Sequence, residues 1–302
     1  MKWRKLGLVW GPKGDLPWAR THAYVPTAYV ADRERIRVYV TCWDEQKVGR
    51  PGWVDVAADD PTRVLDFSRE PILDVGDRGC FDDGGVTVTC AVDWQGRLHL
   101  YYVGWQLAVR VPYMLFGGLA YGDQGRFVRH APVPVLDRIA EQPYCRTGAC
   151  VLAEDRLRMW YWSARDWRVD PDGRVRYSAE ISYAESDDGA HWRLVQSDCL
   201  KPEPDDYAIG RPWVVHDSDC YRMWYSIRST SNEIPYRIGY AESEDGRQWT
   251  HQDARVGITV SPSGWDSQMI CFASVVDAGE RYMFYNGNDH GAEGFGVAVW
   301  VP

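Results

Sequence analysis

The stretch DYAIGRPWVVHDSDCYRMWY, residues 206–225, recurs in altered form along the chain. It joins a strand-like apolar run, a tight polar turn and a second strand that ends in an aromatic residue. The same pattern is present in TVTCAVDWQGRLHLYY, TGACVLAEDRLRMWY and CFASVVDAGERYMFY, and more weakly in PTAYVADRERIRVYV. The copies end at Val40, Tyr102, Tyr161, Tyr225 and Tyr285. Because successive ends are about sixty residues apart, five copies of one unit account for the chain.

Each hairpin is followed by more strand-like sequence. GLAYGDQGRF, SYAESDDGAHW and GYAESEDGRQW each contain a third strand, an Asp/Gly turn and an aromatic residue that would begin a fourth strand. Four antiparallel strands repeated around an axis are typical of a propeller blade. The last copy lacks one strand, and KWRKLGLVW precedes the first copy. The sequence therefore predicts an all-β, five-bladed β-propeller, a single domain of residues 1–302 with four antiparallel strands per blade and a ring closed by the N-terminal strand.

Charge and composition indicate which partners and which cellular compartment to expect. The net charge is −9, and the absence of a Lys/Arg-rich run argues against a nucleic-acid partner. No apolar stretch approaches a membrane span, and the apolar part of the opening segment is too short for a signal peptide. We therefore expect a cytoplasmic protein with no membrane partner. The eight cysteines contain no CxxC pair and are expected to be reduced and mostly buried.

The repeat also identifies candidate catalytic residues, because the first strand of every blade lines the axis of a propeller. Asp83, Asp206 and Asp266 hold the same place at the entrance of that strand in three copies. Carboxylates that converge on one cavity can act as general acid and general base. Asp also favours turns for backbone reasons, which is the structural alternative. The predicted catalytic residues are Asp83 and Asp266, with Asp82 beside them.

Cationic and ring-bearing residues near the same register are candidates for substrate binding. Arg211 stands between Gly and Pro on an inner strand, so its guanidinium needs an anionic or hydrogen-bonding partner, and a structural ion pair with one of the aspartates is the alternative to a ligand. Aromatic rings offer stacking surfaces for a sugar, and amide side chains suit its hydroxyl groups. The candidate substrate-binding residues are His22, Arg146, Arg211, Asp206, Trp105, Tyr144, Trp265, Asn286 and Asn288.

The order of FDDGGV, GRPW, GWDS and FYNGN resembles that in the five-bladed furanosidase-like propellers, which include glycoside hydrolase families 32, 43, 68 and 130. Within this superfamily the chain is most similar to bacterial glycosidase-like proteins found near polysaccharide or small-molecule biosynthesis genes. Family 43 places its catalytic acids in Asp-Pro and Glu-Gly-Pro contexts. The comparable sites here read Val25-Pro26, Thr147-Gly148 and Arg211-Pro212, so those carboxylates do not carry over.

The resemblance implies a glycoside hydrolase-like enzyme that acts on a sugar or sugar-containing small molecule in an axial cavity, with a role in biosynthesis. Hydrolysis would then depend on Asp83, Asp82 and Asp266 at a shifted register. Two alternatives remain open: phosphate-dependent cleavage or glycosyl transfer, with Arg211 and Arg146 on the phosphate, and a non-catalytic carbohydrate-binding propeller. The sequence requires no cofactor, and no His/carboxylate spacing demands an axial metal ion, which stays an open alternative.

Overall fold

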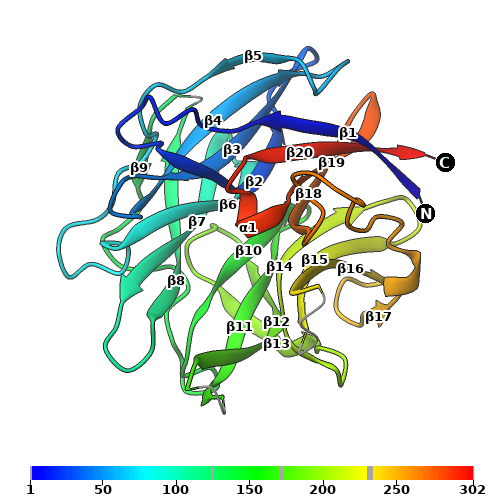
Figure 1. Cartoon of the computed structure of the whole chain (residues 1–302). Coiled ribbons are helices and arrows are strands. Elements are labelled where there is room, and N and C mark those ends of the chain that lie inside the picture. The colour runs from blue at the N-terminus through cyan, green and yellow to red at the C-terminus, as the bar shows by residue number, and fades with distance from the viewer. Residues whose placement is uncertain (1, 124, 171–172, 230–233, 302) are drawn as a thin grey trace.

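The computed structural model describes residues 2–123, 125–170, 173–229 and 234–301, and its regular structure is almost entirely β (Figure 1). The strands are β1 Lys2–Trp10, β2 Thr21–Val30, β3 Arg35–Trp43, β4 Gly49–Ala57, β5 Val64–Phe67, β6 Gly85–Trp94, β7 Arg97–Leu107, β8 Tyr113–Gly122, β9 Phe127–Arg129, β10 Arg146–Ala153, β11 Leu157–Val169, β12 Val175–Ser186, β13 Arg193–Leu200, β14 Asp206–His216, β15 Tyr221–Ser229, β16 Tyr236–Ser243, β17 Thr250–His251, β18 Cys271–Ala278, β19 Glu280–Asn286 and β20 Phe295–Val301. A 3₁₀ turn, Asp253–Arg255, and a short helix, α1 Asn288–Gly291, are the helical segments of the described residues. None of the helices in this part of the chain has the length and apolar character needed to cross a bilayer.

The strands pair antiparallel in five successive groups: β2 to β5, β6 to β9, β10 to β13, β14 to β17, and β18 to β20 with β1. Short parallel bridges join the first four groups into one sheet. The first strands of the groups also contact one another in the order β2, β6, β10, β14 and β18, and β18 in turn contacts β2. The groups are therefore arranged around a common axis, and the fold is propeller-like.

The N-terminal strand completes the last group. β1 pairs antiparallel with β20, from Lys2 opposite Val301 to Trp10 opposite Phe295, and Figure 1 shows the two ends of the chain close together. Trp3 is buried and meets the ring of Trp300 edge to face, with 5.1 Å between ring centroids. The predicted pairing of the N-terminal segment with the last copy is confirmed.

The aromatic residues that end the repeated hairpins belong to the core. Tyr102, Tyr161, Tyr225 and Tyr285 are each no more than 1% exposed. They lie on the second strands, where alternate side chains of a strand point toward the neighbouring group. This placement explains why the sequence repeats an aromatic residue there, since burying a large ring stabilises the contact between groups.

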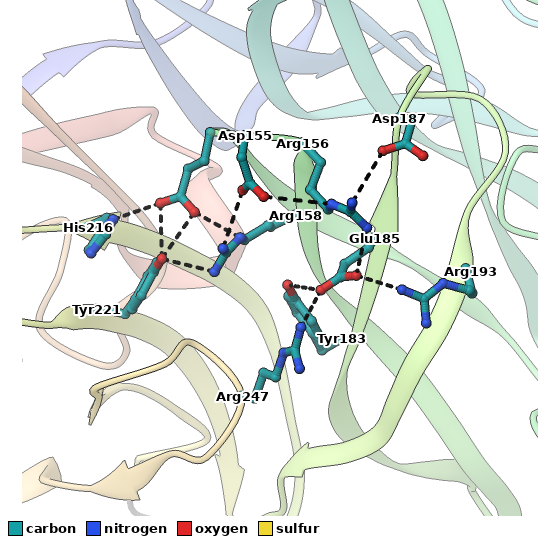
Figure 2. Close-up of polar contacts among 11 residues, drawn as sticks. Asp155, Arg156, Arg158, Tyr183, Glu185, Asp187, Arg193, His216, Tyr221 and Arg247 are labelled. Atoms are coloured by element: carbon teal, nitrogen blue, oxygen red, sulfur yellow. Dashed lines mark hydrogen bonds and ion pairs between the residues drawn. The ribbon is translucent and has the colours of Figure 1, made fainter.

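Polar side chains add a second kind of contact between the third and fourth groups (Figure 2). The carboxylate of Glu185 accepts hydrogen bonds from Arg193 at 2.7 Å, Arg247 at 2.6 Å and the hydroxyl of Tyr183 at 3.0 Å. Burial alone would raise the pKa of Glu185, but the bonds from Tyr183 and Arg247 bring it below its ordinary value. The ionised carboxylate therefore links β12, β13 and the turn after β16.

We expect Glu185→Gln to lower the free energy of unfolding by roughly 1–3 kcal/mol, because nearly buried charge-assisted bonds lose their acceptor charge. The folded pKa is depressed, so this contribution is complete above the unfolded pKa and is lost as the pH falls through the folded value. Urea unfolding at pH 7 and at pH 3.5 measures both effects. Glu244→Gln, at an exposed position, serves as the control. Equal losses for the two variants would contradict the role of Glu185.

The predicted burial of the cysteines is confirmed, and their reduced state remains a prediction. All eight cysteines are free, and six are buried: Cys42, Cys90, Cys145, Cys150, Cys199 and Cys271. We expect a thiol reagent to titrate eight groups in denatured protein and about two in native protein, since buried thiols react slowly. A measured mass two or more protons lower than the reduced chain would instead indicate disulfides.

Candidate functional site

A cavity of about 340 Å³ lies where the first strands of the groups converge. Its wall is rich in aromatic rings, which come from the inner strands, from the ends of second strands and from the starts of third strands. These rings belong to Tyr24, Trp43, Trp105, Tyr113, Trp162, Tyr177, Tyr236 and Phe272. Trp105 Nε1 donates to Thr87 Oγ1 at 3.1 Å and so holds one ring in place. Such a wall suits the apolar faces of a sugar.

The inner strands reach this cavity through β-bulges. Register shifts interrupt the pairing of β2, β10, β14 and β18 with their second strands. The bulge regions each contain a residue with a left-handed backbone, with φ of 52° at Val25, 69° at Gly148, 49° at Arg211 and 58° at Phe272. All four residues line the cavity. The bulges therefore direct one position of each of these strands toward the axis.

A positive φ costs energy in any residue with a side chain, and glycine alone adopts it freely. Three of the four bulge positions nevertheless carry side chains. Strained backbone of this kind is concentrated at functional sites, where the surrounding structure maintains it. The bulges are thus an independent indication that the cavity is the functional site.

The polar groups of the wall are hydroxyls and cations. Thr87, Thr89, Thr147 and Ser226 line the cavity together with Arg211, whose guanidinium binds Thr27 and lies 5.0 Å from the ring centroid of Trp213. No Asp or Glu is among the described residues that line it. The electrostatic character of the cavity is therefore positive, in contrast to the net charge of −9 of the chain.

Arg228 and His290 lie where the cavity meets an outer hollow of about 740 Å³. Arg228 donates to the hydroxyl of Tyr177 at 2.8 Å. The ring of His290 stacks on Phe272, with 6.0 Å between centroids. Burial, together with the charge of Arg228, lowers the pKa of His290 to about 4. This imidazole is therefore neutral near pH 7.

The predicted acids line neither the central cavity nor the outer hollow. Asp266 is 2% exposed and accepts bonds from Lys5 at 2.6 Å and Tyr285 at 2.9 Å. Asp82 is 1% exposed and accepts a bond from Arg129 at 2.7 Å. Asp83 is half-buried and accepts a bond from the Gly79 amide at 2.8 Å. The structure does not bring the three carboxylates together around the central cavity.

A structural pattern accounts for the repeated aspartates. In three groups, the tyrosine that ends the repeated hairpin motif donates a hydrogen bond from its hydroxyl to the polar residue just before the first strand. The pairs are Tyr102 with Asp82 at 3.2 Å, Tyr161 with Gln142 at 2.7 Å and Tyr285 with Asp266 at 2.9 Å. The position equivalent to Asp266 in the second group is therefore Asp82, one residue before the Asp83 that equal spacing selects.

The candidate substrate-binding residues divide into two sets. Arg211 and Trp105 line the central cavity, and His22 stacks on the cavity residue Trp43 with 3.8 Å between ring centroids. The others lie outside its wall and have partners within the fold: Arg146 with Tyr161, Asp206 with Arg237, Trp265 with Tyr285, Asn286 with the Val25 amide, Asn288 with the Gln268 amide, and Tyr144 packed against a buried cluster that includes Trp162.

Trp105 was predicted from the sequence, but other cavity residues that the repeat could have revealed were missed. Trp43, Trp105 and Arg228 each stand three residues after the end of a repeated hairpin. Tyr113 and Tyr236 each begin a third strand. The ends of second strands and the starts of third strands therefore reach the cavity as well, and a register taken along first strands alone does not find them.

Among the residues that the structure describes, no three His, Cys, Asp or Glu side chains gather closely enough to hold a metal ion.

Comparisons with known proteins agree with the geometry. No protein-family model matches the chain. A solved structure named "Glycoside hydrolase" has a similar fold, with a TM-score of 0.78 and 18% identity; the match covers 99% of this chain and 92% of that chain. A glycosyl hydrolase from Bacteroides ovatus matches with a TM-score of 0.75 and 15% identity, over 99% of this chain and 93% of that chain. A third comes from work on the GH130 family of mannoside phosphorylases (TM-score 0.73, 13% identity, 99% and 94%). The chain therefore has the fold of glycoside hydrolases.

Two sequence relatives cover nearly the whole chain. "Uncharacterized protein Rv1502" from Mycobacterium tuberculosis strain H37Rv is 38% identical over 303 residues, which is 99% of each chain. The protein MT1551 from strain CDC 1551 is also 38% identical over 303 residues. Identity of this extent over full length shows common ancestry and a common fold. The chain belongs to the same protein family as Rv1502 of Mycobacterium tuberculosis.

Proposed function

We propose that the chain is a single-domain, five-bladed β-propeller that binds a sugar or sugar-containing small molecule in its central cavity and acts on a glycosidic bond. The five antiparallel groups, the cyclic contacts of their first strands and the pairing of β1 with β20 support the blade count and the closed ring. The fold shared with glycoside hydrolases supports the reaction class. The free cysteines fit a reducing compartment, which supports action in the cytoplasm.

One observation carries the proposal: the cavity combines aromatic walls with hydroxyl groups at the place where the bulged inner strands meet. Trp105, Trp162 and Tyr113 offer ring faces, and Thr147 and Ser226 offer hydroxyls beside them. A sugar presents apolar faces and a rim of hydroxyl groups, so this wall matches it on both counts.

The bond-breaking chemistry has two candidates. Hydrolysis by two carboxylates requires acids near the sugar, and a catalytic role for Asp83 and Asp266 remains a prediction that the cavity wall does not support. Phosphate-dependent cleavage requires cations instead, and the presence of Arg211 and Arg228 at the cavity favours this second candidate.

A glycoside panel tests the function. We expect saturable binding of at least one sugar by calorimetry, and release of its aglycone with or without added phosphate. Trp105→Ala should weaken that binding by about tenfold or more, because a stacking wall is lost. Trp10→Ala, outside the cavity, should not. Binding without turnover would favour the non-catalytic alternative, and binding that Trp105→Ala leaves unchanged would place the site elsewhere.

A further inference from the structure

Arg211 is a buried cation without a carboxylate partner. Its side chain lies in the bulge of β14, and the residue is 6% exposed. The guanidinium donates to Thr27 Oγ1 at 2.9 Å and to the Pro26 carbonyl at 3.4 Å, and its Nε has no hydrogen-bond acceptor. The ionisable groups that influence it are Cys150, Cys90 and Tyr24. None of these is a carboxylate.

The charge of Arg211 persists at neutral pH. Burial lowers the pKa of Arg211 to about 10, so the guanidinium stays protonated near pH 7. A buried charge without a counter-charge is costly, and proteins normally pair it. Arg37 shows the normal case in this chain: it is 4% exposed and binds Asp55 through two nitrogen atoms, at 2.7 and 2.8 Å.

Arg228 adds a second cation with neutral surroundings. Its guanidinium carbon lies 5.1 Å from the ring centroid of Tyr177, 5.2 Å from that of Tyr207 and 5.0 Å from that of Tyr236. Its Nε also has no acceptor. No ion pair joins it to any acid among the described residues. The hydroxyl of Tyr24 lies within electrostatic reach of both Arg228 and Arg211.

The approach to the cavity is also cationic. Arg110, Arg174 and Arg176 line the outer hollow that Arg228 shares with the cavity, and Asp289 is the acid in that wall among the described residues. Clefts lined by one sign of charge concentrate ligands of the opposite sign. Arg176 pairs with Asp170 at 2.7 Å, so its charge is largely compensated and it adds little to the attraction for anions at this approach.

We propose that the ligand of the central cavity is anionic, and that Arg211 and Arg228 bind its carboxylate or phosphoryl group. The inference rests on the proposed sugar site and adds its substrate class: a uronic acid, a sugar phosphate, or a neutral sugar bound beside free phosphate. The aromatic wall then holds the sugar ring while the two guanidinium groups supply the counter-charge that the fold omits.

Calorimetry with paired probes tests this class: glucose against glucuronate and glucose 6-phosphate, galactose against galacturonate, and inorganic phosphate alone and with each neutral sugar. We expect the acidic member of at least one pair to bind tenfold or more tightly than its neutral counterpart, as charge-assisted hydrogen bonds allow. Enhancement of neutral-sugar binding by phosphate would identify free phosphate as the source of the anion.

The variants Arg211→Met and Arg228→Gln should each remove this preference, and Arg63→Gln, at an exposed ion pair, should retain it. Arg211→Met should also unfold at a temperature equal to or above that of the wild type, because an uncompensated buried charge is removed. If Arg211→Met fails to fold, Arg228→Gln still decides the question.

The outcomes separate the two proposals. Equal affinity for acidic and neutral sugars, unchanged in Arg228→Gln, would overturn the anion inference and leave the sugar site standing. Binding of phosphate alone, with no sugar of either charge, would overturn the sugar site and keep the anion site. Absence of binding by every probe would overturn both.

Discussion

Removal of residues 1–11 is expected to lower the thermal midpoint by roughly 10 °C or more. The deletion exposes the edge of β20, uncovers the core around Trp224 and Trp300 that Trp3 contacts, and leaves the carboxylate of Asp266 without Lys5. A buried ion pair that loses one partner costs about 3–5 kcal/mol, to which the lost burial of Trp3 adds.

Scanning calorimetry of the truncated chain measures this loss. Trp3→Ala and Lys5→Met in the full chain divide it into the packing and charge contributions. A truncated protein that unfolds at the temperature of the full chain would contradict the structural role of β1, and the propeller ring would then have to close without it.

Asp266→Asn is expected to destabilise the fold by about 3 kcal/mol, because Lys5 and Tyr285 lose the charge of their common acceptor in a site that is 2% exposed. Asp83→Asn should change stability by less than about 0.5 kcal/mol, since Asp83 is half-buried and accepts a single backbone bond. Urea unfolding measures both values.

Turnover separates this structural role from catalysis. If Asp83 and Asp266 are a general acid and base, each Asn variant should lower kcat by orders of magnitude on an identified substrate. If Asp83 and Asp266 serve only to accept the hydrogen bonds described above, kcat should stay near normal in Asp83→Asn and in folded Asp266→Asn. The double variant Lys5→Met/Asp266→Asn should recover part of the lost stability, because both charges leave together.

The periodicity of the sequence predicted most of the fold. Hairpins that end at a buried tyrosine repeat at nearly constant spacing, and a repeated unit must bury the same faces each time. The hairpin at residues 206–225 became β14 and β15, and the opening segment became β1. These predictions depend on local sequence patterns and on the need to pair the backbone N–H and C=O groups at the edge of a sheet. Both can be argued from a single sequence.

The candidate site was only partly predictable. Arg211 was identified from its register on an inner strand, and Trp105 as an aromatic ring that could stack on a sugar. Asp83, Asp206 and Asp266 share a register as well, but their side chains bind groups within the fold: the Gly79 amide, Arg237, and Lys5 with Tyr285, respectively. Sequence spacing gives the height of a residue along the strand, whereas a bulge of one or two residues decides whether its side chain faces the axis or the neighbouring group.

The bulges also decide how a ligand can be oriented. Val25, Arg211 and Phe272 extend a side chain toward the axis from three strands, whereas Gly148 extends none, and a Cβ there would meet its nearest neighbour, Trp162, at 3.6 Å. The wall of the cavity therefore carries a side chain at the bulges of β2, β14 and β18 and none at the bulge of β10. Side chains at three of these positions and none at the fourth make the wall one-sided, and under the proposed function this asymmetry would favour one orientation of a chiral ligand, with its charge beside Arg211.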